Sequence, residues 1–215
     1  AARVATLRQW AEQLDAVKYD LAIASLLEVG KSRSEALGEA EEAIDLVRYY
    51  CGEMERHKGY AQDLARVFPR EETTCVLRSL GVIGVISPFN YPVALAVNMM
   101  AGALATGNTV VFKPSAGCTL SAQLLLRSMA GTGLPKGAVN LVAGGDATGR
   151  SLVAQSGIAG IHANSNANGA AQLAVDLHHQ LDFVLFQRRR VGLRESLLAG
   201  ILAALLAAIV MRSTP

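Results

Sequence analysis

The sequence predicts an α/β fold: a partial parallel sheet with helices on both faces, preceded by an N-terminal helical segment. Three observations predict it. The first quarter has apolar residues at helical spacing, the middle contains short runs of β-branched residues, and these runs alternate with stretches of helical length. Such alternation is typical of a parallel sheet, because neighbouring parallel strands need a long crossover between them. With 215 residues, 51% of them hydrophobic, the chain can bury a sizeable core.

The opening segment is predicted to contain three helices. Apolar residues recur at three- and four-residue steps in the first helix: Val4, Leu7, Ala11, Leu14 and Val17. A second helix over 21–27 ends near Gly30, since glycine favours the end of a helix. The third, over about 34–54, has an inward stripe of six residues: Ala36, Ala40, Ala43, Ile44, Val47 and Cys51.

The middle of the chain predicts a partial Rossmann-like sheet. Strands are expected at 76–77, 81–86, 109–112, 139–142 and 158–161, separated in the later part by helices over 94–105, 119–130 and 147–155. The strands are short and wholly apolar, as expected when helices cover both faces of a sheet. In such sheets, ligands bind outside the carboxyl ends of the strands, so the residues after 86, 112 and 142 are the candidates for a site.

Charge and cysteine content exclude several classes of function. The net charge is +2, and no basic run is interleaved with aromatic residues, so no nucleic-acid partner is expected. The three cysteines, Cys51, Cys75 and Cys118, lack CxxC spacing, and the His178-His179 pair is isolated. We therefore expect no metal site and no disulfide framework, and a reducing cytoplasm fits best. Cys51 and Cys75 are predicted to be buried structural thiols.

Three loops follow the predicted strand ends. They are Ser87-Pro88-Phe89-Asn90-Tyr91-Pro92, then Lys113-Pro114-Ser115, then Gly144-Gly145-Asp146-Ala147-Thr148-Gly149. Taken singly, each has an ordinary explanation as a turn asparagine, a solvated lysine or a glycine turn. Together they can fix an amide between two prolines, place an ammonium near sugar or phosphate oxygens, and admit a diphosphate at a helix start.

These loops lie within longer motifs. The motifs are the 88–92 stretch PFNYP, the 107–114 stretch GNTVVFKP and the 133–142 stretch GLPKGAVNLV. In this order they resemble the aldehyde dehydrogenase superfamily, with Glu28-Val29-Gly30-Lys31 and the 45–50 stretch as upstream support. The resemblance covers about residues 3–161 and is closest to bacterial enzymes that oxidise semialdehydes or aromatic aldehydes.

The resemblance implies NAD(P)-dependent oxidation of a small-molecule aldehyde to a carboxylic acid. It implies that Asn90 donates to the oxyanion formed from the aldehyde. The cofactor site would be formed by Ile86, Ser87, Pro88 and Phe89 at the nicotinamide end, and by Lys113, Ser115, Gly145 and Gly149 at the adenosine and diphosphate end. Ala116 stands where the family often has a glutamate that binds the adenosine ribose, so the choice between NAD and NADP is open.

The family pattern stops after Ile161. The next residues are His162, Ala163 and Asn164, where the family has an FTGS segment, and neither the cysteine nucleophile nor the ELGG-like segment with its glutamate base follows. We therefore expect residues 1–161 to form a partial NAD(P)-binding domain and residues 162–215 to be a non-family tail with an apolar helix. By ancestry the function is aldehyde oxidation, but the chain alone is expected to be inactive.

The apolar run near the C-terminus and the open edge of the predicted sheet bear on whether the chain binds a membrane or another protein. The apolar run at 197–211 predicts a buried or partner-seeking helix, or else a membrane-associated one, and it falls short of the about 20 residues that span a bilayer. A membrane partner is therefore the less favoured prediction. An incomplete parallel sheet leaves an open edge, which predicts self-association or pairing with a full-length homologue. The alternative function is accordingly a non-catalytic nucleotide-binding or homologue-pairing module.

Overall fold

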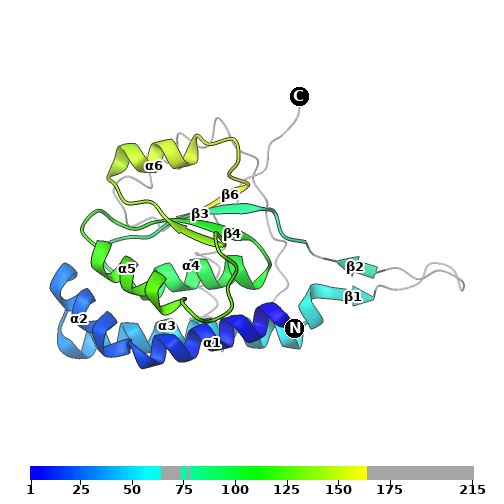
Figure 1. Ribbon diagram of the computed structural model, residues 1–215, viewed down its shortest axis with the longest axis horizontal. Coiled ribbons are helices and arrows are strands. Elements are labelled where there is room, and N and C mark those ends of the chain that lie inside the picture. The colour runs from blue at the N-terminus through cyan, green and yellow to red at the C-terminus, as the bar shows by residue number, and fades with distance from the viewer. Residues whose placement is uncertain (64–73, 77, 164–215) are drawn as a thin grey trace, which may run out of the picture.

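The computed structural model describes residues 1–63, 74–76 and 78–163. It opens with three helices, α1 (Ala2–Ala16), α2 (Lys18–Val29) and α3 (Arg33–Arg56), which lie together along one side of the molecule (Figure 1). A capping box starts α3: the Ser32 side chain accepts from the Glu35 N–H, and the Glu35 carboxylate accepts from the Ser32 N–H. Gly30, with φ of 76°, ends α2 in the left-handed conformation. The predicted helical opening is confirmed.

A small hairpin follows α3 and projects from the rest of the fold (Figure 1). After the 3-10 turn η1 (Lys58–Tyr60), β1 (Ala61–Asp63) pairs antiparallel with β2 (Thr74–Val76). Cys75 lies in β2 and is exposed, so the prediction that it is a buried thiol was wrong. The physical reason is that no other element of the described residues packs over this two-stranded ribbon, so the side chains of β2 are all exposed.

The main sheet contains four parallel strands in the order β5-β4-β3-β6. These are β3 (Val82–Ile86), β4 (Thr109–Lys113), β5 (Val139–Leu141) and β6 (Gly160–Ala163). The connecting helices are α4 (Ala94–Ala105), α5 (Thr119–Ser128) and α6 (Asp146–Val153). The predicted parallel α/β fold is thus confirmed. β6 begins two residues later than expected, because the Ile158 N–H bonds to Gln155 O in a turn after α6.

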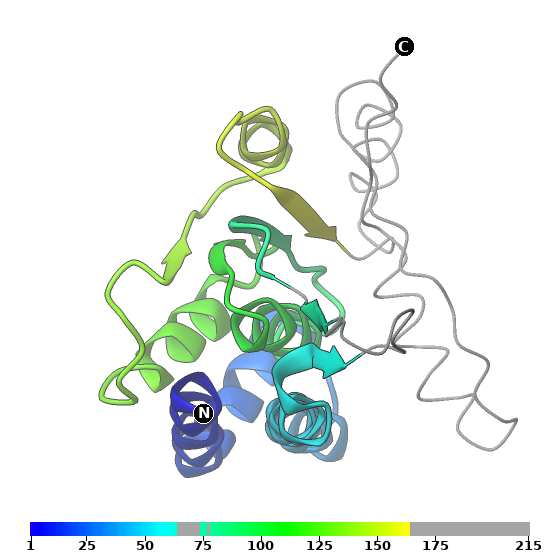
Figure 2. The same cartoon turned by 90° about the vertical axis from the view of Figure 1, so that its right-hand side faces the viewer.

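The sheet is covered on both faces, as Figures 1 and 2 show. α6 lies on one face, whereas α4 and α5 lie on the other, with α1, α2 and α3 packed beneath them. The chain runs outward from β3 to β4 and β5 and then returns to place β6 on the other side of β3. In a Rossmann-like sheet, this reversal marks the crevice where ligands bind, which here is the carboxyl end of β3.

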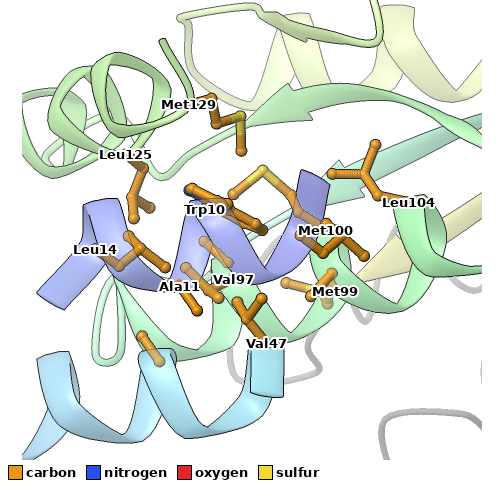
Figure 3. Packing of buried hydrophobic residues seen from close by; sticks show 14 of the residues in the cluster. Trp10, Ala11, Leu14, Val47, Val97, Met99, Met100, Leu104, Leu125 and Met129 are labelled. Carbon is orange, nitrogen blue, oxygen red and sulfur yellow. The ribbon is translucent and has the colours of Figure 1, made fainter. Parts of the chain in front are cut away.

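The larger hydrophobic core lies between the opening helices and the sheet. Figure 3 shows Trp10 at its centre, among side chains from α1, α3, α4 and α5. The labelled members are Trp10, Ala11, Leu14, Val47, Val97, Met99, Met100, Leu104, Leu125 and Met129. Among the residues that the structure describes, no helix combines the length and apolar character needed to cross a membrane. The predicted apolar helix at 197–211 lies outside the described residues.

Candidate nucleotide-binding site

Two of the three candidate loops leave adjacent strands at the same edge of the sheet. Ile86, the last residue of β3, pairs with Lys113, the last residue of β4, and the Ser87 N–H donates to Lys113 O at 3.2 Å. Phe112 pairs with Leu141 at the end of β5, so the glycine loop that follows β5 also starts at this edge. Parallel pairing therefore places the starts of all three loops at one edge of the sheet.

The turn at 87–93 contains two buried polar atoms without a partner. Ser87 is 2% exposed, and among the described residues neither its Oγ nor the Asn90 Oδ1 has a hydrogen-bond partner. Buried polar atoms are nearly always paired, and leaving one unpaired costs about 1–3 kcal/mol. Pro88 is buried beside them, whereas the Phe89 ring is largely exposed. The turn thus has unused hydrogen-bonding capacity where the sheet order reverses.

A buried carboxylate from α3 holds the far end of this turn. Glu39 is fully buried, and its Oε1 accepts from the Val93 and Ala94 N–H groups at 2.8 and 3.2 Å. Its Oε2 accepts from Ser25 Oγ and Lys31 Nζ, both at 2.7 Å. Every polar atom of the carboxylate is therefore used, and the start of α4 is capped by a residue 54 positions earlier in the chain.

Lys31 also contacts the turn directly. Its Nζ lies 3.5 Å from the centroid of the Tyr91 ring, next to Asn90, while forming the ion pair with Glu39. Both charged residues were missed in the sequence as supports of this turn. Glu39 could have been noticed, since it follows Ala36 by three positions and so falls on the inward stripe of a predicted helix, where a charge needs a partner.

Lys113 is a buried cation at the end of β4. It is 6% exposed, and its Nζ donates to Pro114 O at 3.1 Å. Burial lowers the pKa of Lys113 below its usual value, and the negative charge of Asp146 partly opposes this shift. Since Asp146 is the first residue of α6, the ammonium and the start of that helix are neighbours. One bond to Pro114 leaves ammonium hydrogens available for a ligand within the described part of the chain.

The glycine loop before α6 is closely packed. Gly144 has a φ of 153°, and a Cβ atom built on it would lie 2.7 Å from the Thr148 Cβ, so no larger residue fits without rearrangement. Gly145 precedes the first residue of α6, and Gly149 is buried within this helix. The start of a helix offers free N–H groups to an anion, and here it lies beside the Lys113 ammonium.

The cysteines show no sign of activation. Cys118 is buried, its Sγ donates to Phe89 O at 3.7 Å, and burial raises its pKa to about 11. Ser115 reaches the same sulfur with a side-chain hydrogen bond. Burial also raises the pKa of Cys51, and Cys75 lies on the hairpin. Cys51 and Cys118 are therefore neutral thiols near pH 7.

Alkylation should distinguish the three cysteines. Iodoacetamide at pH 8 is expected to modify Cys75 in the folded protein and to reach Cys51 and Cys118 only after unfolding, because burial hinders access and keeps their thiols protonated. Peptide mass spectrometry before and after denaturation measures this. Labelling of native Cys118 at the rate of Cys75 would contradict the neutral assignment and identify an activated thiol beside Asn90.

Comparison with known sequences identifies the family. The Aldehyde dehydrogenase family model matches residues 1–181, which is more than half of the chain. The chain belongs to the aldehyde dehydrogenase family. The match extends past Ile161, so it includes twenty of the residues that sequence analysis assigned to a non-family tail, and the domain boundary at 161 stays a prediction.

Curated proteins and solved structures that are similar to this aldehyde dehydrogenase family chain agree with the family assignment. Alpha-ketoglutaric semialdehyde dehydrogenase from Bacillus subtilis is 35% identical over 173 residues, covering 76% of this chain and 34% of the relative. A proline utilization A mutant from Bradyrhizobium japonicum superposes with a TM-score of 0.78 at 30% identity, covering 83% of this chain and 18% of that one. Betaine aldehyde dehydrogenase from Staphylococcus aureus, in complex with NAD+, gives 0.69 at 26% identity, covering 75% and 33%.

The chain spans about a third of the length of the first curated relatives that it matches, namely 34% and 35%. The family assignment therefore concerns the part with the opening helices and the parallel sheet.

Proposed function

We propose that this chain binds NAD or NADP at the carboxyl edge of its sheet. The observation that carries this proposal is the pair of unpartnered buried atoms, Ser87 Oγ and Asn90 Oδ1, at the point where the strand order reverses. The nearby Lys113 ammonium supports it, since it is buried with hydrogen-bonding capacity unused by its bond to Pro114. A dinucleotide could satisfy both groups at once.

The residues fit the two ends of such a ligand. At the adenosine and diphosphate end, Lys113 with Ser115 would bind ribose oxygens, and Gly145 with Gly149 would allow a diphosphate close to α6. At the nicotinamide end, the backbone of Ile86, Ser87, Pro88 and Phe89 would line the ring and its ribose. The preference between NAD and NADP is open, because Ala116 offers no carboxylate to bind or repel a substituent on the ribose.

We propose that the reaction associated with this chain by ancestry is the oxidation of an aldehyde to a carboxylic acid. We further propose that this chain alone does not catalyse it. The cofactor supplies a hydride acceptor in that chemistry. The Asn90 amide would stabilise the oxyanion of the bound aldehyde. The nucleophilic thiolate has no candidate among the three cysteines, since Cys51 and Cys118 are buried and Cys75 lies on the hairpin away from the sheet edge (Figure 1).

A second candidate function is a non-catalytic module that binds nucleotide or pairs with a full-length homologue or with itself. The observation that favours it is the sheet itself: β5 and β6 each pair with one neighbour among the described strands. A strand with one free edge can accept a partner strand. Both candidate functions use the nucleotide site. They differ in that the second requires a strand of another chain to pair with β5 or β6.

The test combines binding with activity. Calorimetric titration of the purified chain with NAD and with NADP is expected to show binding, and an assay with an aldehyde is expected to show no reduction of the cofactor. Absence of binding to either dinucleotide would refute the proposed site. Cofactor reduction that depends on an aldehyde would instead refute the claim that the chain lacks a nucleophile.

A further inference from the structure

We infer that Glu39 and Lys31 are positioning residues that set the place of the Asn90 amide from outside the site. Neither residue belongs to a strand or to one of the three loops at the strand ends, yet both contact the segment that follows Asn90. The inference rests on the proposed function, because it assigns a role to the turn at the predicted nicotinamide end.

The start of α4 has no capping group of its own. Its N-cap residue is Val93, whose side chain cannot accept a hydrogen bond, so the first N–H groups of the helix need an acceptor from elsewhere. Glu39 Oε1 provides it from α3. A local cap would move with the helix it serves, whereas this one fixes the start of α4 relative to α3. The turn that leads into α4 is thereby fixed too.

Lys31 extends this control to the residue next to Asn90. Its ammonium donates to Glu39 Oε2 and also lies over the Tyr91 ring. Two residues that follow Asn90 are therefore held by side chains from outside the turn. Lys31 contacts Tyr91, and Glu39 binds the N–H of Val93. The preceding residues are anchored separately, through the Ser87 N–H to Lys113 O and the Cys118 thiol to Phe89 O.

The Glu39 carboxylate contacts only one end of the proposed site within the described residues. All four of its described hydrogen bonds are needed to compensate a charge at a fully buried position, so removing the charge should disturb several contacts together. These contacts reach α2, the loop between α2 and α3, and the turn with the start of α4, but none reaches Lys113 or α6. The inferred effect is thus confined to one end of the proposed ligand.

Comparing NAD with ADP, which lacks the nicotinamide end, tests whether the effect is limited to that end. In Glu39→Gln, the dissociation constant for NAD is expected to rise roughly tenfold, the equivalent of one charged hydrogen bond, while that for ADP changes by less than about twofold. Lys31→Met should show the same selectivity. Val47→Ala is the matched control, because it creates a cavity in the core two turns further along α3 and should lower the melting temperature without separating NAD from ADP.

Hydrogen exchange gives a readout that needs no ligand. In Glu39→Gln, amides in the 87–94 peptide should exchange faster than in the wild type, with β4 unchanged, and Val47→Ala should not show this local pattern. If the wild type binds neither NAD nor ADP, the proposed function fails and exchange alone decides the inference. Unchanged exchange at 87–94, or equal weakening of NAD and ADP in Glu39→Gln, would overturn it.

Discussion

Replacing Trp10 with alanine is expected to lower the free energy of unfolding by about 3–5 kcal/mol. Trp10 is 1% exposed and lies at the centre of the core that joins α1 to α3, α4 and α5 (Figure 3). Its Nε1–H also donates to Ser128 Oγ at 2.9 Å, and that hydroxyl donates onward to Leu125 O. The substitution therefore removes a large buried surface and leaves a buried hydroxyl without its donor.

Two other variants calibrate this prediction. Tyr19→Ala removes an aromatic ring that is 64% exposed on α2 and should change stability by less than about 0.5 kcal/mol. Trp10→Phe keeps most of the apolar surface but loses the bond to Ser128, so it should fall between the two. Urea unfolding followed by circular dichroism measures all three. A Trp10→Ala protein as stable as Tyr19→Ala would mean that the opening helices fold independently of the core shown here.

Local sequence patterns predicted most of the fold because burial in this chain follows regular spacing. Val4, Leu7, Ala11 and Leu14 are buried as their helical period required, and the mostly apolar strands form a covered parallel sheet. Errors occurred where no period applies. The start of β6 depends on a turn after α6, and the exposure of Cys75 depends on whether another layer covers the hairpin, which three residues of strand do not reveal.

The candidate site was predictable only to the extent that strand ends locate it. Ser87 and Lys113 could be placed at one edge, since each follows an apolar run, and the pairing of Ile86 with Lys113 agrees with that reasoning. The support around the turn could not be predicted in the same way. Glu39 acts on Val93 across 54 positions of sequence, and such a contact depends on how α3 packs on α4 rather than on any local pattern.

Lys113→Met is expected to weaken NAD and NADP binding by about ten- to a hundredfold. Methionine keeps the length and apolar stem of lysine but offers no donor to a ribose or phosphate oxygen. No ion pair is lost within the described residues, and burying an ammonium is unfavourable, so the variant should fold at least as well as the wild type. Calorimetry then reports the ligand contact rather than the stability of the sheet.

Lys136→Met is the control for the loss of one positive charge. Lys136 is exposed in the loop before β5, at the opposite end of the sheet from Lys113, and its replacement should leave affinity within about twofold. Equal weakening by both variants would mean that net charge, and not a contact at the strand end, draws the dinucleotide to the protein.

The pH dependence of NAD affinity tests whether the Lys113 ammonium contacts the ligand directly. Burial lowers the pKa of Lys113, so in the folded protein its charge is lost as pH rises at values below the usual 10.5. If the charged form is the one that binds, affinity for NAD should fall as pH rises toward 10.5 in the wild type and in Lys136→Met. Lys113→Met has no proton to lose and should bind weakly at every pH. A wild-type affinity that stays constant up to pH 10.5 would show that the ammonium makes no contact with the ligand, even if the substitution weakens binding.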